Sequence, residues 1–285
     1  GLLLHGNPEV YAYIAESLRL HPEAGPIQRA ATAPPPAYDI GDRIEFNVHN
    51  VDTMTNATVT AELVHKTDAA YGWVEEGGEH NARALRRSLD RFSERIYPAL
   101  VGAFGSEWNP GVDNDPRLHV LHTTGMGGTV AGYFSGADAN PRVAFPFSNE
   151  KEMFYISLDW LNRTDDYTYY ETVLAHEFQH MIHWAVDGNE ETWLNEGLSE
   201  YAQEVAGYPP DVGFAYAFAA DPDTQLNTWN MTGGNAAHYG GAYRFVRYLV
   251  QRFGPETVME LVAEPANGVA GVQRAQAREV GKGGG

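Results

Sequence analysis

The sequence contains no cysteine, which excludes disulfide bonds and any metal site built from thiolates. No apolar run approaches the ~18 residues that a membrane-spanning helix requires. Basic residues are also scarce, because 19 Lys and Arg stand against 38 Asp and Glu, a formal net charge of −19. Phosphate binding relies on Lys and Arg, so this balance argues against nucleic acid as a partner.

The rest of the composition is that of a folded protein. The 285 residues are 43% hydrophobic, enough for one large domain or two smaller ones. The lack of cysteine is compatible with export. Many exported bacterial proteins lack cysteine, so we expect a secreted or cell-surface protein of bacterial origin whose signal peptide is not part of this sequence. The sequence carries no signal for an oligomeric state.

Helical spacing predicts an N-terminal helix over 8–20, and prolines predict a linker up to residue 36, so 1–36 is expected to form one segment. Residues 37–78 alternate apolar and polar side chains, which predicts strands around a turn near Asp52–Asn56. A third segment, 79–280, is expected to hold a helix over 80–104, strands near 118–121 and 153–158, and a series of helices. Residues 281–285 are expected to be a disordered tail.

Turn and capping signals divide the second half of the chain into helices. The first is predicted over 169–187, with Thr168 and Glu171 as a capping box and Gly188 as its end. Three more are predicted from Thr192 to before Gly207, over 237–253 and over 255–264. Strands and a long helix followed by helices indicate an α+β fold, with a strand-rich N-terminal half packed on a helical C-terminal half. A cleft between the halves is the expected place for a site.

The most specific motif is H-E-F-Q-H at residues 176–180. Residues four apart share one face of a helix, so His176 and His180 can bind one metal ion. Glu177 lies beside the first histidine and is suited to act as a general base on a metal-activated water. This pattern predicts a zinc site and a hydrolytic reaction.

The third ligand must be His, Asp or Glu, because the chain has no cysteine. His183 lies about two turns along the helix from His176, too far for a single straight helix to offer all three histidines to one ion. A polar or core-facing role suits His183 better. Glu196 and Glu200, both on the next predicted helix, remain as candidates.

Together, H-E-F-Q-H and the later W-L-N-E-G-L-S-E-Y, residues 193–201, resemble the gluzincins, the zinc peptidases whose third ligand is a glutamate. Thermolysin and aminopeptidase N belong to this clan, and the nearest likeness is to the hyicolysin-like bacterial neutral metalloproteases. The resemblance implies a zincin-like fold, Glu196 as the third ligand, Glu200 as a carboxylate that supports a zinc-bound histidine, and Asn195 as a residue that orients the other. The sequence departs from the pattern in one respect: the 15 residues between His180 and Glu196 are fewer than in thermolysin.

The same resemblance points to a donor for the oxyanion of a tetrahedral intermediate. The segment 237–243 is similar to the Y-x-K-G-A element of aminopeptidases. Aligned on its Gly-Ala pair, His238 occupies the position of the catalytic tyrosine and Tyr239 follows it. Either residue can instead be a packed aromatic.

These motifs favour a zinc endopeptidase with a peptide or protein substrate. The alternatives are a zinc aminopeptidase of the same clan and an inactive zincin-fold binding or adhesion module. An aminopeptidase needs a G-x-M-E-N element, and Glu150-Lys151-Glu152-Met153 does not match it. An inactive relative would usually lose a ligand or the base, and this chain has both. A calcium ion at Asp113-Asn114-Asp115 is a weaker hypothesis, because Pro116 and Arg117 break the EF-hand pattern.

Overall fold

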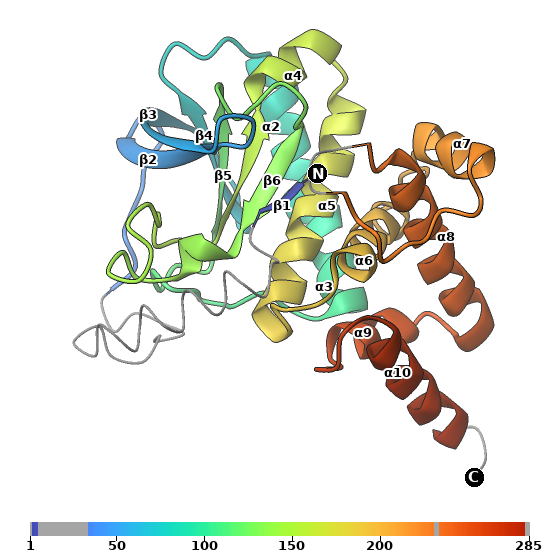
Figure 1. Ribbon diagram of the computed structural model, residues 1–285. Helices are drawn as coiled ribbons and strands as arrows, with labels where there is room; N and C mark the ends of the chain where they lie inside the picture. Colours follow the sequence, from blue (N-terminus) through green and yellow to red (C-terminus); the bar gives the residue numbers. More distant parts are fainter. Residues whose placement is uncertain (1, 5–33, 231–233, 283–285) are drawn as a thin grey trace. The chain divides into compact units, whose positions relative to one another are not determined.

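The computed structural model describes residues 2–4, 34–230 and 234–282 (Figure 1). The chain forms two compact units. The first comprises residues 1–98 and 108–178, and the second comprises residues 99–107 and 179–285. The boundary at residues 178 and 179 lies inside one continuous helix, α5 (Tyr167–Val186), which carries the H-E-F-Q-H motif.

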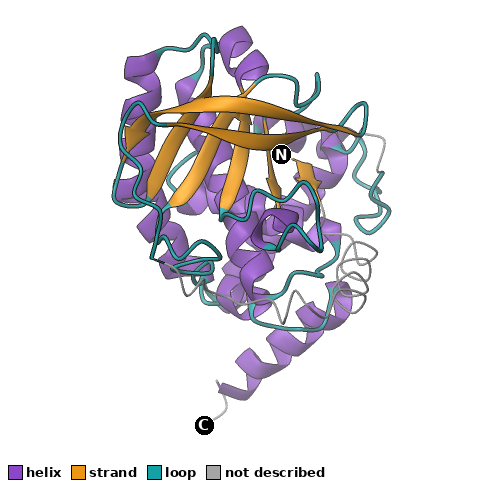
Figure 2. Ribbon diagram, turned by 90° about the vertical axis from the view of Figure 1, so that its left-hand side faces the viewer, coloured by secondary structure: helices purple, strands orange, loops and turns teal. Residues whose placement is uncertain are grey.

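The first unit contains a seven-stranded mixed sheet with the order β1-β6-β7-β5-β4-β3-β2 (Figure 2). Its strands are β1 (Leu2–Leu4), β2 (Arg43–Asn50), β3 (Thr55–Lys66), β4 (Ala70–Glu75), β5 (Leu118–Thr123), β6 (Gly132–Ser135) and β7 (Met153–Ser157). Strands β2, β3 and β4 form an antiparallel meander, whereas β4, β5 and β7 run parallel. Strand β6 is antiparallel to β7 and parallel to β1.

One face of the sheet is an aromatic-rich core. Phe46 in β2 pairs with Val59 in β3, and Leu63 in β3 pairs with Trp73 in β4. Leu63 and Trp73 are fully buried. Because successive strand residues point to opposite faces, alternate positions of each strand supply this cluster. The alternation in the sequence therefore predicted both the strands and the side of the sheet that they bury.

The other face of the sheet packs against helices. Helix α2 (Ala82–Arg91) continues through a π-helical segment, Phe92–Ile96, into α3 (Tyr97–Phe104). Phe92 packs edge-on against Phe154 of β7, with ring centroids 6.1 Å apart, and against Phe178 of α5 at 5.4 Å. The hydroxyl of Tyr170 lies 2.7 Å from Nε2 of His122 in β5. These contacts fix the orientation of the first part of α5 on the sheet.

The start of α5 differs from the predicted capping box. Oδ1 of Asp166 accepts hydrogen bonds from the backbone N–H groups of Thr168 and Tyr169, at 3.0 and 3.1 Å. Glu171 is instead bound by Ser88 and Arg91 of α2. Asp is an effective N-cap, so the helix begins about two residues earlier than predicted and Glu171 is free to bind α2.

The second unit is helical. It includes most of α3 and the end of α5. Its other elements are α6 (Thr192–Val205), α7 (Val212–Ala220), α8 (Ala236–Phe253), α9 (Thr257–Val262) and α10 (Gly268–Lys282). Gly197 of α6 lets α8 approach closely, because a Cβ there would lie 2.9 Å from the carbonyl oxygen of Ala242. This close approach brings the N-terminal part of α8 near the residues that follow Glu196.

Several predictions from the sequence are confirmed. The fold mixes a sheet with helices, the strand turn lies between β2 and β3, and helices occur at or near 80–104, 169–187, 192–206, 237–253 and 255–264. Among the described residues, no helix has both the length and the apolar character to cross a membrane.

Other predictions are corrected. The strands of the segments 37–78 and 79–280 belong to one sheet, a pairing that the sequence did not predict. Strand β6, helix α4 (Leu158–Thr164), which follows β7 directly, and helix α7 were not predicted. Helix α10 extends to Lys282, so residues 281 and 282 belong to a helix rather than to a tail. The helix predicted at 8–20, most of the linker and residues 283–285 lie outside the described residues.

The close contact between β6 and α5 at Gly132 gives a test of how tightly the helix packs on the sheet. A Cβ on Gly132 would lie 2.8 Å from the carbonyl oxygen of Tyr155 and 2.9 Å from Val173 of α5. We expect Gly132→Ala to lower the free energy of unfolding by about 1–3 kcal/mol, because overpacking must displace the helix or the strand. Urea denaturation measures this change. Gly128→Ala is the matched control, since its Cβ would meet nothing closer than 3.7 Å. Equal stability of the two variants would contradict the close packing.

Candidate metal centre

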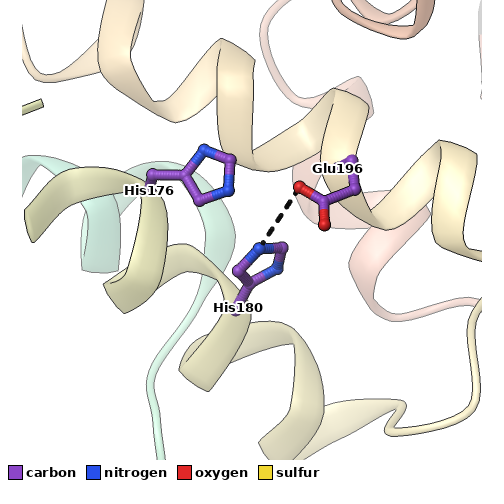
Figure 3. A group of neighbouring side chains, drawn as sticks. All are labelled: His176, His180 and Glu196. Carbon is purple, nitrogen blue, oxygen red and sulfur yellow. Dashed lines mark ion pairs between the residues drawn. The ribbon is translucent and has the colours of Figure 1, made fainter. Parts of the chain in front are cut away.

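Three side chains of the types that bind metal ions extend from α5 and α6 toward one another. His176 and His180 lie one turn apart on α5, and Glu196 lies on α6. One ligand atom from each residue lies within 4.8 Å of the other two (Figure 3). All three side chains are buried, at 2%, 0% and 1% exposure. The two residues of the motif and the glutamate implied by the resemblance therefore form one group.

The ring of His180 is held in one tautomer. Its Nδ1 lies 2.5 Å from Oδ1 of Asn195 and 2.9 Å from Oγ of Ser199. An amide oxygen only accepts hydrogen bonds, so Nδ1 carries the proton and Nε2 keeps its lone pair. Nε2 lies 3.5 Å from Oε2 of Glu196. The histidine thus presents an unprotonated nitrogen to the carboxylate side of the group, as a metal ligand must.

Asn195 therefore occupies the orienting position that the resemblance implied. Ser199 was not singled out from the sequence, although it lies four residues after Asn195 and hence on the same face of α6. Its hydroxyl also donates to Oε1 of Gln179, the residue before His180. The four-residue spacing of Asn195 and Ser199 is the feature of the sequence from which Ser199 could have been predicted as a second partner of His180.

Glu177 is fully buried, and neither of its carboxylate oxygens has a hydrogen-bond partner among the described residues. Burying a carboxylate without a partner costs several kcal/mol, so folded proteins rarely retain one without a use. The residue precedes Phe178 and follows His176 on α5. A carboxylate that is buried, has no hydrogen-bond partner and lies beside residues that can hold a metal ion is suited to accept a proton from water or substrate.

The remaining predicted residues lie on α6 and α8. Glu200 is 4% exposed and lies one turn after Glu196, so it is not a solvated helix residue. Tyr239 is stacked on Phe214, with centroids 4.7 Å apart, and contacts Trp229 edge-on. These contacts suit the packed-aromatic alternative for Tyr239.

His238 is half-buried and less enclosed than Tyr239. Its Nε2 lies 3.4 Å from the hydroxyl of Thr228, and its Nδ1 has no partner among the described residues. A ring nitrogen without a protein partner can donate to a bound ligand. His238 therefore has one buried ring nitrogen without a partner among the described residues.

His183 lies in the core, as expected, and is not part of the group formed by His176, His180 and Glu196. It is fully buried, and burial together with nearby His180 lowers its pKa to about 3. The ring is therefore neutral near pH 7. It lies in a separate group with Asp187 and Glu190, which was not predicted from the sequence.

The aspartates considered for calcium have other partners. Asp113 Oδ2 lies 3.3 Å from Nε2 of His119 and 3.7 Å from Nζ of Lys151. Asp115 accepts a hydrogen bond of 2.7 Å from the hydroxyl of Tyr71. Calcium requires six to eight oxygen ligands, and these carboxylates are engaged with cationic or donor groups. The structure adds no support for a calcium ion here.

Compared with known proteins, the chain matches no protein-family model and no curated protein sequence. The chemistry of the site therefore rests on its own geometry. Two imidazoles and a carboxylate, all buried and within reach of one another, fit a divalent transition metal, and the unpartnered Glu177 fits a reacting group beside it. His176, His180 and Glu196 can hold a metal ion.

The contact between Asn195 and His180 gives a test of this centre. We expect Asn195→Ala to weaken metal binding about 10–100-fold, because loss of an outer partner frees the ring to change tautomer and orientation. Competition with a coloured chelator measures the affinity. Asn227→Ala, an exposed asparagine of the same unit, is the control and should bind like the parent. If both variants bind equally well, the hydrogen bond does not support a ligand.

Proposed function

We propose that this protein is a zinc-dependent endopeptidase of the gluzincin type. The observation that carries the proposal is the unpartnered, fully buried carboxylate of Glu177 beside the group formed by His176, His180 and Glu196. A structural metal site has no need of such a carboxylate, whereas a hydrolytic site needs a base. A bound zinc ion would acidify water and polarise the scissile carbonyl.

The protein residues divide the remaining work. Glu177 accepts the proton of the attacking water and later delivers it to the leaving amine. Asn195 and Ser199 hold the tautomer of His180, and Glu200 is proposed to support the other side of the ligand set. His238 is the preferred donor to the developing oxyanion, because its Nδ1 has no partner in the described part of the chain, and Tyr239 is the second candidate.

An endopeptidase is favoured over an aminopeptidase because the carboxylates of Glu150 and Glu152 already accept hydrogen bonds from the backbone. An aminopeptidase uses carboxylates to bind the free amine of its substrate. Oε1 of Glu150 accepts a hydrogen bond from the backbone of Arg142. Both carboxylate oxygens of Glu152 accept from the N–H of Val112, at 2.9 and 2.8 Å. Neither carboxylate is available in the way that amine binding requires.

Cleavage mapping separates the three candidate functions. Zinc-loaded protein is incubated with a denatured protein substrate in two forms, one with its amines acetylated and one unblocked. The products are sequenced by mass spectrometry. Internal cleavage supports the endopeptidase, because acetylation blocks the amine that an aminopeptidase binds. Cleavage of single residues from the unblocked substrate alone supports the aminopeptidase. Intact substrate in both cases, with metal bound, supports a binding module and contradicts the proposal.

The role of the base is tested by Glu177→Gln. We expect the variant to fold and to bind metal like the parent, because the amide fills the same space and Glu177 is not a ligand. Hydrolysis should fall by at least ~10²-fold, the lower range for loss of a general base. Elemental analysis and a peptidase assay measure the two properties. Glu256→Gln, at an exposed glutamate directly before α9, should keep full activity. Retained turnover in Glu177→Gln would overturn the mechanism.

The oxyanion donor is tested by His238→Ala and Tyr239→Phe. A donor that acts only in the transition state lowers kcat and leaves KM nearly unchanged. We expect His238→Ala to lose about 10²–10³-fold in kcat with metal content intact. Tyr239→Phe should keep kcat within a few-fold, because its ring packing survives. Tyr248→Phe, on the exposed side of α8, controls for loss of a hydroxyl. The opposite order would assign the role to Tyr239, and two near-parental variants would exclude both.

A further inference from the structure

A second group of ligand-type side chains lies at the C-terminal end of α5. His183 lies in the last turn of α5, and Asp187 is the first residue after the helix. Glu190 lies in the loop before α6. One ligand atom from each residue lies within 4.8 Å of the other two. Atoms that bind one ion at ~2.0–2.2 Å must lie within roughly 4 Å of one another, so small side-chain movements bring this group into range.

Each of the three residues has a buried polar atom without a hydrogen-bond partner in the described part of the chain. These atoms are both ring nitrogens of His183, Oδ2 of Asp187 and Oε2 of Glu190. His183 is 0% and Glu190 is 1% exposed, and Asp187 is partly exposed although its Oδ2 is buried. Buried polar atoms nearly always have partners, so four such atoms on three neighbouring residues point to a shared partner.

The other carboxylate oxygens are already in use, which leaves the unpartnered ones facing the group. Oε1 of Glu190 accepts from the backbone N–H groups of Glu191, at 2.5 Å, and of Gly268, at 2.6 Å. Oδ1 of Asp187 accepts from the N–H of Asn189 at 3.4 Å. Glu190 is therefore fixed by the first residue of α10, and its second oxygen is left for another ligand.

The donor set selects the kind of cation. One imidazole and two carboxylates are typical of zinc and related divalent transition metals. Calcium needs six to eight oxygens, and magnesium keeps an octahedral shell of oxygens and waters, which a buried group of three side chains does not provide. Sodium and potassium bind imidazole poorly. Zinc is therefore the appropriate probe.

We propose that His183, Asp187 and Glu190 form a second divalent-metal site, which takes zinc and ties the end of α5 to the start of α10. The ion is structural in this proposal: it neutralises two buried carboxylates and joins three parts of the second unit, α5, the loop before α6 and the N-terminus of α10. Its presence does not depend on whether the first centre is catalytic.

The test counts metal ions in the full chain. Protein stripped with a chelator is reloaded with zinc, desalted and measured by elemental analysis. We expect two equivalents in the parent, one in Asp187→Asn and one in Glu190→Gln. Asp223→Asn, an exposed aspartate of the same unit, should keep two. A millimolar excess of calcium should displace neither ion.

A variant in the first centre makes the two sites distinguishable. Glu196→Gln should also hold one equivalent, and the double variant Asp187→Asn with Glu196→Gln should hold less than a tenth. If Asp187→Asn loses an ion and Glu196→Gln does not, this proposal stands and the proposed function fails. If the parent binds one ion that only Glu196→Gln removes, His183, Asp187 and Glu190 form a hydrogen-bonded network without metal, and this proposal is wrong.

A measurement on the unchanged chain guards against variants that do not fold. Cadmium-113 NMR of the reloaded parent should give two resonances at saturation, both in the range of nitrogen and oxygen ligands, since the chain has no cysteine. Circular dichroism shows whether each variant has the parent's helical content. A single cadmium resonance of one equivalent at saturation would overturn the second site regardless of how the variants behave.

Discussion

The burial of α5 is the constraint on which the other features depend. Every residue from Tyr170 to His183 is buried, although the stretch contains ionisable and amide side chains as well as apolar ones. A buried polar group without a partner costs free energy, and a buried charge costs more. The surroundings of this helix must therefore supply partners along its whole length. Most of the contacts around the candidate metal centre are made by these partners.

Different neighbours meet this requirement along the helix. Near its start, α2 binds Glu171 and β5 binds Tyr170. Further along, Asn195 and Ser199 of α6 bind the ring of His180. Besides Nε2 of Gln179, two places remain where the described residues supply no partner: the carboxylate of Glu177, and the group that begins with His183. One is suited to a reacting molecule and the other to a cation, and the difference follows from the donor sets.

The two groups share a spacing. His176 and His180 are four residues apart on one face of α5. His183 and Asp187 have the same spacing at the end of the helix, where Asp187 is the first residue after Val186. In each case a glutamate further along the chain completes the group, Glu196 on α6 and Glu190 in the preceding loop. Our proposals assign zinc to both, with hydrolysis at the first and a structural role at the second. The unpartnered base next to the first group is what distinguishes them.

The sequence by itself determined the features that depend on local spacing. Alternation gave the β2–β3 hairpin and its buried face, periodicity gave the helices, and the i, i+4 rule gave His176 and His180 with Glu177 beside them. The third ligand depended on a resemblance, because spacing alone left Glu196 and Glu200 open. Short elements such as β6 and α7 were missed, since their pattern is too brief or too uniformly apolar to show a period.

Tertiary structure decided what lies across from each side chain. No local rule places Ser199 against His180, Glu171 against α2 or Glu190 against the first residue of α10, because those partners are distant in the sequence. The cap of α5 is a local exception: Asp166 replaced Thr168 because its carboxylate reaches the backbone N–H groups two and three residues further on. Spacing along a helix fixes which side chains share a face, whereas the fold alone fixes which buried polar atoms find a partner.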